Sequence, residues 1–157
     1  MFSVGGTVEL SIFGFVSATA TFEFVQSSAD VDVNGDGIID VSAGDLDDAL
    51  LTTLSLTVSH LFIGLPDEGI GFELTQADLA IAIIKSQDPM DDRSFTAVSA
   101  SLTGASLVGI EGLTVTANTL TLEINQASSV SDPSVTALDW NTSINKDADS
   151  SAGPGFS

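Results

Sequence analysis

The chain has 157 residues, of which 22 are acidic and three are basic, and its formal net charge at pH 7 is −19. This charge excludes nucleic acid and anionic membrane surfaces as electrostatic partners, because their phosphate groups would be repelled. Cysteine is absent, which excludes disulfides and leaves a metal ion or a neighbouring module to staple the fold.

Alternating apolar and polar residues first appear at residues 7–12, where Val8, Leu10 and Ile12 alternate with Thr, Glu and Ser. The same period of two recurs at 18–24, 54–59 and 120–125. Each run predicts an antiparallel strand with one apolar face turned inward and one Ser/Thr/Glu face turned to water. We therefore predict an all-β domain over residues 1–140, either an antiparallel β-sandwich or a β-roll.

The segment after the second run, residues 32–40, reads Asp-Val-Asn-Gly-Asp-Gly-Ile-Ile-Asp. It matches the first nine positions of an EF-hand calcium loop, in which oxygen ligands alternate and a glycine at position 6 allows a sharp turn. Position 12, normally a bidentate Glu, is Ala43, and Asp45 could replace it in a slightly enlarged loop. The predicted Ca²⁺ ligands are the side chains of Asp32, Asn34, Asp36, Asp40 and Asp45 and the backbone carbonyl of Ile38.

An acidic turn without a metal is the alternative for residues 30–48, which we expect to be a loop inserted between strands. Seven acids fall in this stretch and would repel one another strongly without a counter-ion. Asp47 and Asp48 are reserve ligands, and Asp30 lies just upstream. Within the same stretch, Gly44–Thr53 has acids in its first turn and predicts one short helix of about two turns.

Residues 71–83 superpose without gaps on residues 112–124, which indicates a duplicated strand unit. Between the copies, the acidic segment 86–93 contains Asp88, Asp91 and Asp92, which could form a second calcium site. The preferred interpretation is a solvated loop in which Arg93 pairs with Asp91 or Asp92.

The C-terminal part predicts one more strand, Val135–Trp140, anchored to the core by Trp140. Residues 141–157 are rich in Ser, Asp and Gly and predict a linker to a following module. The chain begins Met-Phe-Ser and ends Gly-Phe-Ser, an overlap that a module cut from a tandem array would show. No run approaches the ~20 apolar residues of a membrane helix, and any export signal is expected elsewhere in a longer chain.

Catalytic groups are scarce. His60 is the only histidine and has no nucleophile elbow near it, so we expect no Ser-His-Asp triad. Four glutamates on the outward parity of predicted strands are expected to be solvated rather than paired for glycoside hydrolysis. They are Glu9, Glu23, Glu73 and Glu123. We therefore expect that this chain is not an enzyme.

The run Asp32-Val-Asn-Gly-Asp-Gly resembles the calcium loop of dockerins and thrombospondin-type repeats, although a dockerin has two such loops with helices. More broadly, the strand runs around 93–98 and 106–115 resemble the tandem β-modules of giant bacterial secreted and adhesin-like proteins. This resemblance implies an extracellular or cell-surface location, calcium rigidification and head-to-tail joining to copies of the same module. The expected function is a structural repeat of an adhesin or surface fibre, and the alternative is a carbohydrate-binding β-sandwich.

Overall fold

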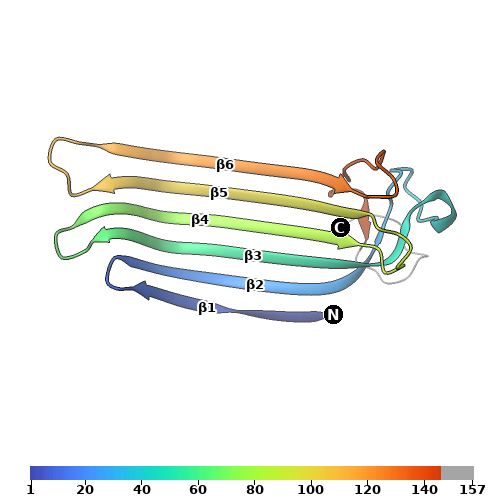
Figure 1. The fold of residues 1–157 in the computed structure, drawn as a ribbon, viewed down its shortest axis with the longest axis horizontal. Coiled ribbons are helices and arrows are strands. Elements are labelled where there is room, and N and C mark those ends of the chain that lie inside the picture. Colours follow the sequence, from blue (N-terminus) through green and yellow to red (C-terminus); the bar gives the residue numbers. More distant parts are fainter. Residues whose placement is uncertain (146–157) are drawn as a thin grey trace.

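Six long strands follow one another as an antiparallel meander in a computed structural model that describes residues 1–145 (Figure 1). The strands are β1 (Phe2–Ile12), β2 (Val16–Val31), β3 (Leu46–Leu65), β4 (Ile70–Lys85), β5 (Ser94–Val108) and β6 (Val115–Ser128). A short strand, β7 (Ile144–Asn145), pairs with the end of β2. The predicted antiparallel all-β fold is confirmed, and the described residues arrange it as one layer rather than two stacked sheets.

The alternation in the sequence places most large apolar strand residues on one face of this layer. Cross-strand partners share a face, and one row of partners runs Val8, Ala20, Val58, Ala77, Leu102 and Leu120 across β1–β6. The opposite face carries the Ser, Thr and Glu side chains between them. We call the first surface the apolar face and the second the polar face.

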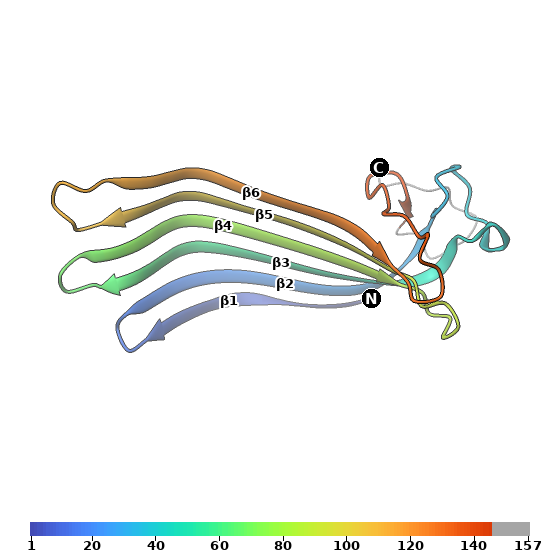
Figure 2. The same cartoon turned by 45° about the horizontal axis from the view of Figure 1, so that its top comes forward.

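A coordinated bulge keeps the apolar face continuous along the strands. Leu61 follows Val58 by three positions on β3, but their partners on β2, Ala18 and Ala20, are only two positions apart. The same three-residue step recurs at the same row of β4, β5 and β6, and on β5 it includes Gly104 with φ +66°. The extra residue in each of these strands keeps the apolar side chains beyond the bulge on the same face as those before it. The strands curve together in Figure 2.

The buried core lies at one end of the sheet, on the polar-face side, where the parity of the apolar residues reverses. Leu51, Ile84 and Phe95 form a row of partners there and are buried. The segment 129–145 folds over this row, and its Leu138 and Ile144 are buried in the same cluster. Among the described residues, most of the buried core therefore lies beside the strand ends that hold the loop of residues 32–45.

The helix predicted at Gly44–Thr53 is wrong, because residues 46–53 belong to β3. Ala49 and Leu51 pair with Ala29 and Ser27 of β2 and are buried, so sheet pairing outweighs the local capping signal. The described helical structure is a single 3₁₀ turn, Val41–Ala43. Within residues 1–145, no helix is long and apolar enough to cross a membrane.

The strand predicted at Val135–Trp140 is also wrong, because this segment is irregular. Within residues 1–145, its backbone pairs with no strand. Its anchors are side chains: Leu138 is buried, and Trp140 packs against the core as predicted. Asn125 of β6 donates to the Leu138 carbonyl at 2.8 Å and accepts from Trp140 Nε1 at 3.0 Å.

The first residues of the predicted linker are part of this fold. Ser143 and Ile144 are buried, and Ile144 pairs with Val31. The rest of the predicted linker, residues 146–157, lies outside the described residues.

Candidate metal centre

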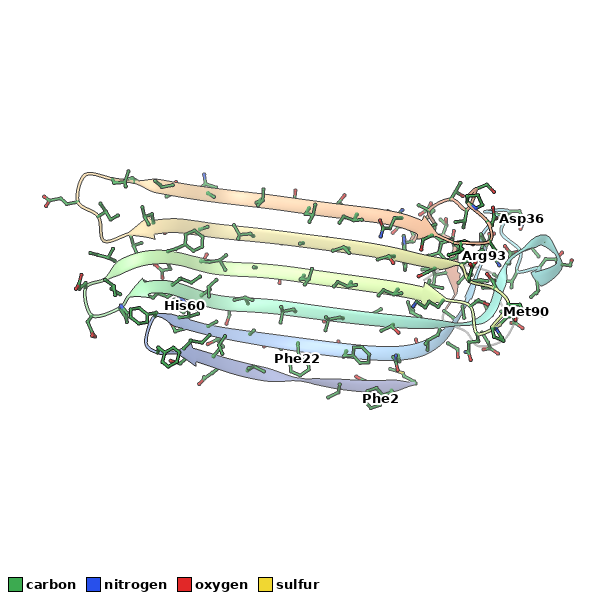
Figure 3. The ribbon with its side chains drawn as sticks, viewed as in Figure 1. Phe2, Phe22, Asp36, His60, Met90 and Arg93 are labelled. Carbon is green, nitrogen blue, oxygen red and sulfur yellow. The ribbon has the colours of Figure 1, made fainter. Side chains whose placement is uncertain are left out.

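The pairing of β2 with β3 brings two aspartates side by side. Val31 and Leu46 are cross-strand partners, so Asp32, which follows Val31, and Asp45, which precedes Leu46, leave the sheet at the same point. The Asp32 amide donates to the Ser143 carbonyl at 2.9 Å, which ties this point to the segment before β7. The loop between the two aspartates extends beyond the end of the sheet, where Asp36 lies in Figure 3.

Three carboxylates converge in this loop. Asp32, Asp36 and Asp45 each offer an oxygen within 4.8 Å of the others. Asp32 and Asp45 are each only 2% exposed, whereas Asp36 is exposed and open to solvent. Two buried acids and one exposed acid therefore make a half-open cluster of oxygen atoms that could hold a cation.

No family model, curated protein or solved structure matches this chain.

The turn around Asp32 is built from its own carboxylate and two glycines. Asp32 Oδ1 accepts from the amides of Gly35 at 2.6 Å and Asp36 at 3.3 Å, and Oδ2 accepts from Gly37 at 2.7 Å. Gly35 and Gly37 have φ values of +74° and +86°, in the left-handed region that glycine adopts without strain. These bonds wrap the backbone around the carboxylate, and the positive φ of Gly37 gives the sharp turn expected at position 6 of the motif.

Asp45 closes the loop from the other side. Its Oδ1 accepts from the amides of Val33 at 2.8 Å and Asn34 at 3.3 Å, and its Oδ2 accepts from Asp40 at 2.9 Å. Because a carboxylate offers about four lone-pair sites, both Asp32 and Asp45 keep acceptor capacity for a cation. Asp45 therefore lies in the cluster, whereas Ala43, at position 12 of the motif, has no side-chain oxygen to offer.

The remaining predicted ligands have local hydrogen bonds of their own. Asn34 Oδ1 accepts from the Asp36 amide at 2.8 Å. Asp36 Oδ1 accepts from the amide of Ile38 at 2.9 Å, and it is the Ile38 carbonyl that was predicted to bind calcium. Asp40 lies outside the group of three, and its Oδ1 accepts from the amide of Ser42 at 2.9 Å and its hydroxyl at 2.6 Å. These bonds lower the pKa of Asp40 and make it the cap of the 3₁₀ turn.

Asp30, two residues before Asp32 on β2, is fully buried and lies outside the cluster. Its Oδ1 accepts from the Asp48 amide at 2.9 Å, and its Oδ2 accepts no hydrogen bond from the described residues. Burial raises the pKa of Asp30, and the neighbouring acids Asp47 and Asp48 add to this effect.

The acidic loop 86–93 uses its aspartates for structure. Arg93 pairs with Asp91 at 2.7 Å, as the preferred interpretation predicted, and this guanidinium lowers the pKa of Asp91. Arg93 Nη1 also donates to the Gly44 carbonyl at 2.6 Å, which links this loop to the cluster. Asp88 Oδ1 accepts a hydrogen bond from the Met90 amide within the same turn. In the part of the chain that the structure describes, Asp88, Asp91 and Asp92 do not form a second metal-binding group.

Asp92 holds a segment that the sequence does not connect to it. It accepts from the hydroxyls of Ser129 at 2.5 Å and Ser131 at 2.7 Å, and from the amides of Val130 at 2.9 Å and Ser131 at 3.0 Å. These hydrogen bonds, led by those of the two serine hydroxyls, lower the pKa of Asp92 to about 2. They fix the start of the segment that covers the core.

The residues considered for catalysis do not join this cluster. His60 lies on the polar face toward the opposite end of the sheet, far from Asp36 and Arg93 in Figure 3. The four glutamates also lie on the polar face, as their parity predicted, paired across the strands with Ser, Thr, Gly or Phe.

Proposed function

We propose that this chain is a calcium-stabilised structural module of a large extracellular bacterial protein, such as an adhesin or surface fibre, joined to neighbouring copies of itself. The observation that carries the proposal is the convergence of Asp32, Asp36 and Asp45 where β2, β3 and the segment before β7 meet. A cation bound there would tie three parts of the chain together at the end of the sheet beside most of the buried core.

The donor set favours calcium over other metals. All available ligands are oxygens, the chain has no cysteine, and its only histidine lies far from the cluster. Oxygen ligands in a flexible loop suit Ca²⁺, whereas Zn²⁺ prefers sulfur and nitrogen. Two nearly fully buried carboxylates lie within 4.8 Å of each other, and buried charges of like sign call for a counter-ion.

The position of the cluster favours a structural role. The loop connects paired strands, and Asp32 and Asp45 direct their oxygens to the loop's own amides, so a bound ion would stabilise the folded loop. Binding that occurs only in the folded state adds to stability by mass action. Extracellular display is consistent with this reading, because calcium is plentiful outside cells and the acidic, cysteine-free composition suits that environment.

The decisive measurement is the thermal unfolding of the chain in saturating calcium and in EDTA. Calcium at about 100 times its Kd should add about 3 kcal/mol, which corresponds to a rise in Tm of about 5–10 °C for a chain of this size. Asp45→Asn should abolish this rise, because it removes a buried carboxylate from the cluster. Asp67→Asn, which makes the same charge change in the hairpin between β3 and β4, should preserve it.

Magnesium at the same concentration serves as the ion control. It should give a much smaller rise in Tm than calcium, because Mg²⁺ demands stricter geometry and gives up its water reluctantly. Equal melting curves in calcium and EDTA, with the chain folded by circular dichroism, would refute the calcium proposal.

A groove favours carbohydrate binding as a second candidate function. It lies on the polar face beside Trp140 and is lined by Glu23, Ser99, Glu123 and Asn125 among others. An aromatic ring beside carboxylate and amide groups suits a sugar, which presents apolar and hydroxyl surfaces together. A glycan array comparing the chain with Trp140→Phe tests this candidate, since specific binding weakened by the substitution would support it.

A further inference from the structure

The apolar face of the sheet has no cover in the described part of the chain. Val8 and Leu10 on β1 are about half exposed, and Leu120 and Leu122 on β6 are 65% and 53% exposed. Toward the loop end, this face becomes more polar, because Gln26, Thr52, Thr96 and Gln126 share a row with Phe2 and Ile83. A sheet with one uncovered apolar face is half of a two-layered β-structure.

The size of this face exceeds what a monomer usually exposes. Six strands spaced by about 4.8 Å, each contributing about ten residues of 3.3 Å rise, cover roughly 1,000 Å². Monomeric proteins rarely expose contiguous apolar patches above a few hundred Å². Two such faces packed together would bury roughly 2,000 Å², which matches the area of a stable protein–protein interface.

Charge selects which partner can reach this face. Beyond the loop end, the acidic residues of the strands all lie on the polar face: Glu9, Glu23, Glu73, Asp78 and Glu123. Copies of this chain each carry a net charge of −19, so they repel one another over most of their surfaces. The uncharged apolar face is the surface on which identical chains can meet without opposing carboxylates.

We propose that the apolar face packs against the same face of a second copy of this chain, so that two single layers complete one β-sandwich. Such an isologous contact needs no feature beyond this face, and sheets pack in this way with an interior about 10 Å thick. This contact specifies the surface through which two copies meet. It rests on the proposed function only in assuming that neighbouring copies are present. Its test leaves the calcium loop intact, so either proposal can fail alone.

The test uses analytical ultracentrifugation of the full chain in saturating calcium. The wild type, with a chain mass of 16.1 kDa, should sediment as a dimer. The double variant Leu120→Glu/Leu122→Glu places charges on the apolar face at exposed positions, where the monomer tolerates them, and should weaken dimerisation about 100-fold or more. The matched variant Thr119→Glu/Thr121→Glu adds the same charges to the same strand on the polar face and should remain dimeric.

Single cysteines give an independent measurement, because the chain has none of its own. In the dimer, a maleimide should label Leu122→Cys at least about tenfold more slowly than Thr121→Cys, since only the apolar face is covered. Equal labelling in a dimer would overturn the proposal and indicate pairing through the free edges of β1 or β6. A wild type that is monomeric at about 100 μM, or that binds neutral lipid vesicles instead, would overturn it as well.

Discussion

Asp92 shows how one carboxylate can fix a distant segment. Its four hydrogen bonds join the loop before β5 to residues 129–131, which begin the segment that covers the core. Hydrogen bonds to an ionised carboxylate are stronger than those between neutral groups, so the ionisation of Asp92 is coupled to the docking of this segment.

The lowered pKa of Asp92 predicts a specific acid dependence of stability. Its folded pKa of about 2 lies below its ordinary value of 3.8, so its contribution is fully present well above pH 4 and is lost as the pH falls toward 2. We expect Asp92→Asn to be less stable than the wild type near pH 6 and to approach it near pH 2. Urea unfolding in calcium-free buffer across this range measures the difference.

Ser131→Ala provides the matched control for this prediction. It removes one hydroxyl donor and keeps the carboxylate, so its deficit should be smaller and should follow the same pH range. A stability difference between Asp92→Asn and the wild type that stays constant from pH 6 to pH 2 would contradict the role given to Asp92.

At the cluster of carboxylates, the sequence predicted the oxygen-rich loop and Asp45 as the replacement for position 12, and the structure brings Asp32, Asp36 and Asp45 together. The spacing of these residues is local, so the pattern is readable in one dimension. The hydrogen bonds between Asp92 and residues 129–131 were not predicted, because partners 37 to 39 residues apart share no local sequence pattern.

The segment 129–145 covers a small part of the sheet, as a second layer would. It covers the row of Leu51, Ile84 and Phe95 with side chains rather than with a regular strand. Leu138 is the most buried residue of this segment before β7, with 3% of its surface exposed.

We expect Leu138→Ala to lower the free energy of unfolding by about 2–4 kcal/mol, because it leaves a cavity against the sheet. Val130→Ala in the same segment should change it by less than about 0.5 kcal/mol, since Val130 is 94% exposed. Chemical denaturation of the two variants measures both values. Similar effects for both substitutions would show that the segment does not pack as described.

The beginning of β3 shows why element boundaries were only partly predictable. Acids at the start of 44–53 are typical of a helix N-terminus, but Ala49, Leu50 and Leu51 are buried, exposed and buried in turn once β2 lies beside them. Pairing with a strand that precedes the loop decides the outcome, and helix propensity is too weak to oppose it. The alternating runs in β1, β2 and β6, and the run 54–59 later in β3, had no such conflict.

For the whole molecule, the net charge of −19 is a destabilising term that acts over all surfaces. Salt should relieve it. Raising sodium chloride from about 0.01 M to about 1 M shortens the screening length from about 30 Å to about 3 Å. We therefore expect Tm in EDTA to rise with salt, as measured by circular dichroism.

The charge origin of this effect can be isolated on the polar face. A variant combining Glu9→Gln, Glu23→Gln and Glu123→Gln removes three negative charges without touching the loop or the core. Its Tm should depend less on salt than that of the wild type. A wild-type Tm that is flat or falls with salt would contradict the role given to self-repulsion.

The all-β class, the division of each strand into an apolar and a polar side, and the acidic loop were readable from the amino-acid order alone, because they depend on residues close together in the chain. The single layer, the shared bulge that keeps its apolar face continuous, and the core at one end under residues 129–145 became visible only in the folded chain. Periodicity indicates which side chains avoid water. What covers them depends on contacts between distant segments, which periodicity does not record.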